Sequence, residues 1–219
     1  MLIKKCTLTE GDGQMAERLE LLKKAEQIAN LIFEKLNELR HTPIKDAGLG
    51  SLLLIFKLQN DIKENKADFS SLDPKIYEII LFGSVAKDSE NPTDIDLMIF
   101  DNGHFSNFFP CMTNEHHMDD WYENLGENFQ WLMDGWFNVH DDQLKQILGN
   151  VEVDCHILPM RFFKSKELRE EVAEKHKDPN FFKNAFGEAM RFNRSEGKFE
   201  PLTFEYLEEQ FRCRLEDLR

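Results

Sequence analysis

The segment LFGSVAKDSENPTDIDL, residues 81–97, contains the features that decide the fold. It begins at the end of an apolar run, from about Ile76 to Phe82, which is typical of a strand buried on both faces. Gly83-Ser84 ends that strand, and Val85-Ala86-Lys87 begins a short helix. Apolar and polar residues then alternate from Asp94 to Phe100, which predicts a second strand. The sequence therefore predicts two strands joined by a short helix and a turn.

Two aspartates on the second predicted strand indicate a metal site. Asp94 and Asp96 are two residues apart, so their side chains are expected on the same face. Neighbouring carboxylates repel each other unless a cation lies between them. Oxygen ligands of this kind suit Mg²⁺ or Mn²⁺, which also bind substrate phosphates. A solvated strand face is the alternative, and Gly83-Ser84 upstream favours the metal site.

A third strand is expected from about Val151 to Leu158, with Glu152, Asp154 and His156 on its polar face. Asp154 is the central residue of the three, and we prefer it to Glu152 as a third carboxylate. If this strand lies beside the second, Asp154 completes a two-metal site. In such a site one ion activates the attacking hydroxyl and the other stabilises the leaving pyrophosphate.

The Gly83-Ser84 turn predicts a phosphate-binding site. A glycine at a strand end lets backbone N–H groups approach a phosphate closely, and the helix that starts there directs its positive end at the same place. The Ser84 hydroxyl and the Lys87 ammonium can add contacts. Gly83, Ser84 and Lys87 are therefore expected to bind the triphosphate tail of a nucleotide.

These motifs resemble the signature of the DNA polymerase beta-like nucleotidyltransferase superfamily, in its minimal, MNT-like form. Residues 83–88 are similar to the Gly-Ser motif of that family, with Lys87 in place of the usual arginine and Asp88 in place of a frequent glycine. Residues 94–96 match its Asp-x-Asp motif, and the resemblance covers about residues 77–158. The segment between Asp-x-Asp and the third strand is longer than in the smallest members.

The resemblance implies an α+β fold, a small mixed β-sheet with helices packed on one side. It implies a metal-dependent enzyme that moves a nucleoside monophosphate from a nucleoside triphosphate to a hydroxyl acceptor and releases pyrophosphate. Asp94, Asp96 and Asp154 would be the catalytic residues and the ligands of Mg²⁺ or Mn²⁺, while Gly83, Ser84 and Lys87 would bind the nucleotide.

The resemblance leaves the acceptor open among an aminoglycoside antibiotic, a protein side chain in a toxin–antitoxin pair, a transfer RNA end and a second nucleotide. The alternative function is a non-catalytic or regulatory module of the same fold, such as a toxin–antitoxin partner protein. The intact set of three aspartates favours the enzyme.

The amino-acid composition limits the classes of molecule that the protein is expected to bind. The net charge of -14 disfavours long nucleic acid, since affinity for it rests largely on Lys and Arg, so a small molecule or a protein is the favoured acceptor. There is no apolar run long enough to predict a membrane helix, and the first ten residues lack the apolar core of a signal peptide. The protein is expected to be cytoplasmic, with its four widely spaced cysteines reduced.

Three regions are expected along the chain. Residues 1–70 are predicted to form helices at about Asp12–Arg40 and Leu49–Asn65, which pack on the core and could also serve a homodimer or a protein partner. Residues 71–160 form the nucleotidyltransferase core, and residues 161–219 a C-terminal helical region. That last region is expected to contain three helices, at Ser165–Lys175, Asn180–Phe192 and Pro201–Leu218.

The core contains an aromatic-rich insertion at residues 101–150, with helices expected at Met118–Gly126 and Phe129–Gly149. The preferred interpretation is a helical hairpin whose Trp and Phe side chains fill the core. The alternative is that the insertion shapes the acceptor pocket. Arg191 and Arg194, further along, are expected on a solvated helix face, with an approach to the nucleotide as the alternative.

Overall fold

The computed structural model of the protein describes residues 10–41, 74–87, 89, 92–103, 105–106, 125–160, 167, 170, 174, 177, 186–203, 205, 206 and 209. Its elements in chain order are α1 (Glu10–His41), β1 (Ile76–Phe82), α3 (Gly83–Ala86), β2 (Ile95–Asp101), α5 (Leu125–Gln130), the π-helical segment η5 (Trp131–Trp136), α6 (Asp141–Leu148), β3 (Val153–Pro159), β4 (Met190–Asn193) and β5 (Lys198–Pro201). None of the helices in these residues is long and apolar enough to cross a membrane.

The five strands form one mixed sheet in the order β3-β2-β1-β4-β5. Strand β1 is antiparallel to both β2 and β4, whereas β2 and β3 are parallel. Ile79, Ile80 and Leu81 at the centre of β1 are fully buried, as the apolar run predicts. The predicted α+β fold with a small mixed sheet is confirmed, and the three strands of the sequence analysis are found within two residues of their expected bounds.

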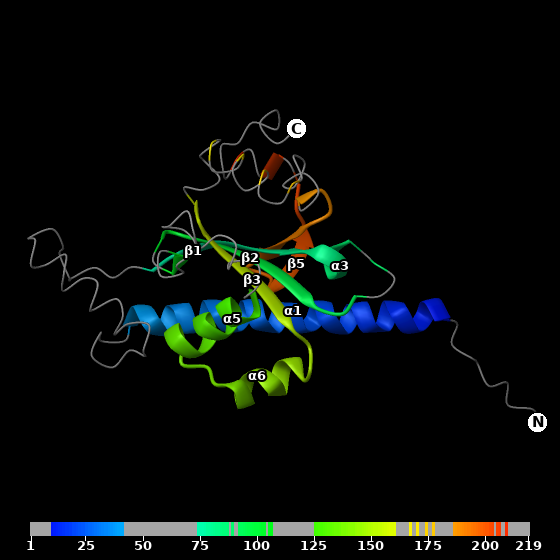
Figure 1. Ribbon diagram of the computed structural model, residues 1–219, viewed down its shortest axis with the longest axis horizontal. Helices are drawn as coiled ribbons and strands as arrows, with labels where there is room; N and C mark the ends of the chain where they lie inside the picture. The colour runs from blue at the N-terminus through cyan, green and yellow to red at the C-terminus, as the bar shows by residue number, and fades with distance from the viewer. Residues whose placement is uncertain are drawn as a thin grey trace, which may run out of the picture.

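Helix α1 runs along one side of the sheet (Figure 1) and confirms the predicted N-terminal helix. Its buried side chains recur at helical spacing, and they include Ala25, Ile28, Ala29, Ile32 and Leu36. Removing this apolar stripe from water is what holds the helix on the sheet. The second predicted helix, Leu49–Asn65, lies outside the described residues.

In the described part of the insertion at residues 101–150, aromatic side chains fill the core, as the preferred interpretation of the sequence predicts. Phe129, Trp136 and Phe137 are buried, and the ring of Phe105 meets that of Trp136 edge to face at 5.1 Å. The prediction of one helix over Phe129–Gly149 is wrong at residues 137–140, which separate η5 from α6. Asn138 has a positive φ of 53°, a conformation that stops a helix and that asparagine tolerates.

The C-terminal region supplies a β-hairpin to the sheet, which corrects the expectation that it is wholly helical. The predicted helix Asn180–Phe192 is wrong at Met190–Phe192, which belong to β4, and Pro201 ends β5 rather than starting a helix. The turn expected at Ser195-Glu196-Gly197 is present. Ring stacking holds this hairpin to α1, with the centroids of Phe33 and Phe192 5.9 Å apart.

Pairing with β1 explains why β4 is a strand. Ile80 and Leu81 pair with Arg191 and Met190, so the hairpin completes the hydrogen bonding of a buried central strand. A tertiary contact of this kind overrides local helix propensity. The described residues leave out most of the other two predicted C-terminal helices, Ser165–Lys175 and Pro201–Leu218. They also leave out most of the predicted helix Met118–Gly126. The three-region division of the chain stays a prediction, although the sheet takes strands from both sides of residue 160.

Candidate functional site

The sheet brings the three predicted aspartates together. Asp94 directly precedes β2, Asp96 lies within it, and Asp154 lies on β3. Asp96 and Asp154 are register partners across the parallel pair of strands. One carboxylate oxygen from each of the three residues lies within 4.8 Å of the others. These oxygens therefore form a compact group, close enough to share a cation.

Gly83 lies against this group because it directly follows β1, whose last residue pairs with Asp96 of β2. Phe82 is the register partner of Asp96, and the next residue, Gly83, has a φ of +68°. A Cβ atom added at Gly83 would lie 1.8 Å from Oδ2 of Asp96, which is far inside contact distance. Only glycine therefore permits this approach, and the backbone N–H of Ser84 donates a hydrogen bond to Asp96.

The Ser84 hydroxyl is a buried polar group that has no hydrogen-bond partner among the described residues. An unsatisfied hydroxyl of this kind costs free energy, which a ligand oxygen at this position would recover. Lys87 follows one turn later and is exposed, and its charge acts on Asp96. The three predicted nucleotide-binding residues thus lie on or directly after one short helix beside the aspartates.

Negative charge is concentrated at this place. Burial, followed by repulsion from Asp94 and Asp154, raises the pKa of Asp96 to about 6. The pKa of Asp154 is also raised, first by burial and then by the charges of Asp94 and Glu152. A divalent cation would relieve this repulsion, so the donor set fits a hard cation that prefers oxygen ligands. Glu152, the alternative third acid, is exposed and outside the group of close oxygens.

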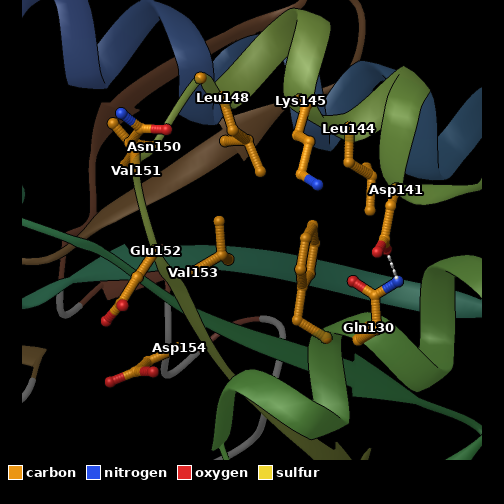
Figure 2. Close-up of a pocket in the computed structure, with 12 residues that line it drawn as sticks. Gln130, Asp141, Leu144, Lys145, Leu148, Asn150, Val151, Glu152, Val153 and Asp154 are labelled. Atoms are coloured by element: carbon orange, nitrogen blue, oxygen red, sulfur yellow. Dashed lines mark hydrogen bonds between the residues drawn. The ribbon is translucent and has the colours of Figure 1, made fainter.

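A cavity of about 510 Å³ lies beside β3, between this strand and the helices α5 and α6. Figure 2 shows Leu144 and Lys145 of α6 directed into it, with the Gln130 amide donating a hydrogen bond to Asp141 at one side. Asp154 also lines the cavity, but its carboxylate extends from the other side of the strand (Figure 2). The cavity and the group of aspartates therefore share the first residues of β3.

The chain matches the model of the nucleotidyltransferase domain family over residues 62–178, more than half of its length. The chain belongs to this family, and the resemblance drawn from its motifs is confirmed. It shows no significant similarity to a curated protein or to a solved structure. The matched range contains the Gly83-Ser84 turn, the three aspartates and the residues that line the cavity.

Other polar residues of the sequence analysis are placed differently. Arg191 lies on β4 rather than on a helix, where it pairs with Glu200 and lies over the ring of Tyr206, 4.0 Å from its centroid. The guanidinium of Arg194 lies 4.6 Å from the ring centroid of Phe33. These contacts hold the C-terminal hairpin to its neighbours and explain both arginines without a nucleotide.

Two contacts close to the site had no signal in the sequence. The Nε–H of Arg18, on α1, donates a hydrogen bond to the carbonyl oxygen of Val85, on α3, at 2.8 Å. His156, two residues after Asp154, is buried with its ring centroid 5.6 Å from that of Phe82. Both contacts join residues far apart in the chain, so neither local periodicity nor a motif could indicate them.

Proposed function

We propose that the protein is a metal-dependent nucleotidyltransferase that moves a nucleoside monophosphate from a nucleoside triphosphate to a hydroxyl acceptor, with release of pyrophosphate. The convergence of Asp94, Asp96 and Asp154 beside the Gly83-Ser84 turn carries this proposal. Membership of the nucleotidyltransferase domain family supports the class of reaction. The first observation is geometric, and the second rests on the pattern of the sequence.

The transfer makes one bond to phosphorus and breaks another. The acceptor oxygen bonds to the α-phosphorus, while the bond from that phosphorus to the oxygen bridging to the β-phosphorus breaks. Pyrophosphate leaves with the electron pair, and the hydroxyl proton of the acceptor passes to a base. Asp154 is our candidate for this base, because it lies beside Asp96 on the neighbouring strand and its side chain is partly exposed.

Asp94, Asp96 and Asp154 would hold Mg²⁺ or Mn²⁺ through their close oxygens. A bound divalent cation supplies positive charge that stabilises the phosphate oxygens as negative charge moves to the leaving group. The Gly83 backbone, the Ser84 hydroxyl and the Lys87 ammonium would hold the triphosphate tail in line with the acceptor.

The acceptor we favour is a small molecule or a protein side chain. The net charge of -14 opposes a long nucleic acid. The cavity beside β3 has a volume typical of small-molecule sites, and both apolar and charged side chains line it. We therefore place a small acceptor in this cavity, from which it would reach around the edge strand to Asp154.

The test is incubation of the purified protein with each α-³²P-labelled nucleoside triphosphate and Mg²⁺ or Mn²⁺, with a cell extract as the source of acceptors. A labelled product is expected that needs the metal, and Asp94→Asn should reduce its rate roughly 100-fold or more, because a metal ligand is lost. Asp142→Asn is the matched control, since Asp142 is an exposed aspartate of α6. Full activity of Asp94→Asn would refute the proposed metal site.

The size of the product would then identify the acceptor class. A wild-type protein that yields no labelled product and shows no metal-dependent nucleotide binding would favour the non-catalytic module, and a stable protein partner would be the next observation to seek.

A further inference from the structure

The short helix that carries Gly83 and Ser84 is held from two sides. On one side the backbone N–H of Ser84 donates to Asp96. On the other side Arg18 donates from its Nε to the carbonyl oxygen of Val85, at 2.8 Å. The last carbonyls of a helix lack partners within it, and α3 has only four residues, so a donor from elsewhere in the fold has a large effect on its position.

Arg18 lies close to the part of α1 that packs into the core. It lies one helical turn before Leu21, the first residue of the buried stripe of α1. Met15 and Leu19, on either side of it in the chain, are exposed, so this end of α1 contributes little to the core. The side chain of Arg18 is half-buried against α3 and bridges residues far apart in sequence. The core thus fixes α1, and α1 in turn positions the turn that carries Gly83.

We propose that Arg18 is a positioning residue for the phosphate-binding turn, and that its Nε–H sets the affinity of the protein for the phosphate tail of the nucleotide. This inference rests on the proposed function, because it assigns phosphate binding to the Gly83-Ser84 turn. We assign this role to the donor at Nε, because the carbonyl oxygen of Val85 accepts its hydrogen bond.

A matched pair of substitutions at Arg18 separates the loss of the hydrogen-bond donor from the loss of the positive charge. In Arg18→Gln the amide nitrogen takes the place of Nε on the same Cδ atom, so a donor remains and the charge is lost. In Arg18→Met a methyl group takes that place, so donor and charge are both lost while the length is similar. Lys23→Met is the control for removing a cation from α1, since Lys23 is exposed.

The first measurement is the dissociation constant of inorganic triphosphate with Mg²⁺, by isothermal titration calorimetry, because this probe presents the phosphate tail without a base. Arg18→Met is expected to weaken binding about five- to tenfold, while Arg18→Gln and Lys23→Met stay within about twofold of the wild type. Equal binding by Arg18→Met and Arg18→Gln, whether weakened or not, would overturn the assignment to the Nε donor.

Hydrogen exchange of the free protein tests the same contact without a ligand. The amides of Gly83 to Lys87 should exchange faster in Arg18→Met than in Arg18→Gln, while the amides of Ile28 and Ile32 in α1 should be unchanged. A uniform acceleration together with a lower melting temperature would mean a purely structural role and would also overturn the inference. If the wild type does not bind magnesium triphosphate, the proposed function fails, and the exchange data still decide whether Arg18 fixes the turn.

Discussion

Asp96 and Asp154 are register partners on the parallel strands β2 and β3, so two carboxylates lie side by side on one face of the sheet. Burial, together with repulsion from Asp94 and Asp154, raises the pKa of Asp96 from 3.8 to about 6. The carboxyl group of Asp96 therefore binds its proton more tightly in the folded protein than in the unfolded chain. Stability from this group is fully present below about pH 4 and is lost as the pH rises to about 6 and above.

Asp96→Asn is expected to stabilise the metal-free protein at pH 7 by roughly 1–2 kcal/mol, less than the full linkage value because the carboxylate is partly exposed. Asparagine keeps an oxygen that can accept from the Ser84 N–H, and it removes the repulsion. Urea unfolding in EDTA between pH 4 and pH 7 measures the effect, and the variant should lose part of the pH dependence of the wild type. A variant less stable than the wild type at pH 7 would contradict the raised pKa of Asp96. Asp142→Asn is the control.

Gly83→Ala is expected to abolish nucleotide binding and to destabilise the fold by more than about 2 kcal/mol, because a positive φ and a clash with Asp96 act together. Gly149→Ala separates the two causes. Gly149 has a nearly equal φ of +65°, but an added Cβ there meets nothing within 4 Å. Thermal unfolding and nucleotide titration of both variants make the comparison. Equal losses in the two variants would mean that backbone strain alone explains the effect.

Much of the centre of the fold was predictable because its signals are local. The apolar run predicted β1 because its central residues are buried. In β2 and β3 the alternation correctly marks the one half-buried position of each strand, Asp96 and Asp154, although all the other residues of both strands are buried. Asp94, Asp96 and Asp154 followed from the same alternation, since it assigns each aspartate to a face. Their convergence also needed β3 to lie beside β2, which the sequence offered only as a condition.

Features that rest on contacts between distant segments were missed. The hairpin of β4 and β5 is held in the sheet because Arg191 pairs with Ile80 of β1. The residues around Arg191 alternate between apolar and polar over only the four positions of β4, which is too short a stretch to distinguish a strand from a helix. The break after η5 depends on the positive φ of one residue, Asn138, within an otherwise helical pattern. Side-chain to backbone contacts such as that from Arg18 to Val85 leave no periodic signal at all.

Ile28→Ala is expected to destabilise the protein by about 2–4 kcal/mol, because Ile28 is fully buried between α1 and the sheet. Leu19→Ala, on the same helix, should change stability by less than about 0.5 kcal/mol, since this side chain is 45% exposed. Denaturant unfolding of both variants gives the difference. Similar values for the two would mean that α1 does not pack on the sheet through the stripe described above.

Lys145→Trp tests the place of the acceptor. Lys145 is directed into the cavity beside β3 (Figure 2), so an indole there would occupy its volume without replacing a core residue. The KM for the acceptor is expected to rise about tenfold or more, while binding of the magnesium nucleotide stays within about twofold, because neither Asp96 nor the Gly83 turn is among the residues that line the cavity. Steady-state kinetics with the acceptor identified by labelling make the measurement.

Two controls divide the possible causes of that effect. Lys145→Gln removes the charge without adding bulk, and Gln146→Trp adds the same bulk at an exposed position of α6 that does not line the cavity. An effect of Lys145→Trp that neither control reproduces would place the acceptor in the cavity. An effect shared with Lys145→Gln would assign it to the ammonium group. Unchanged acceptor kinetics in Lys145→Trp would exclude the cavity as the site of the acceptor.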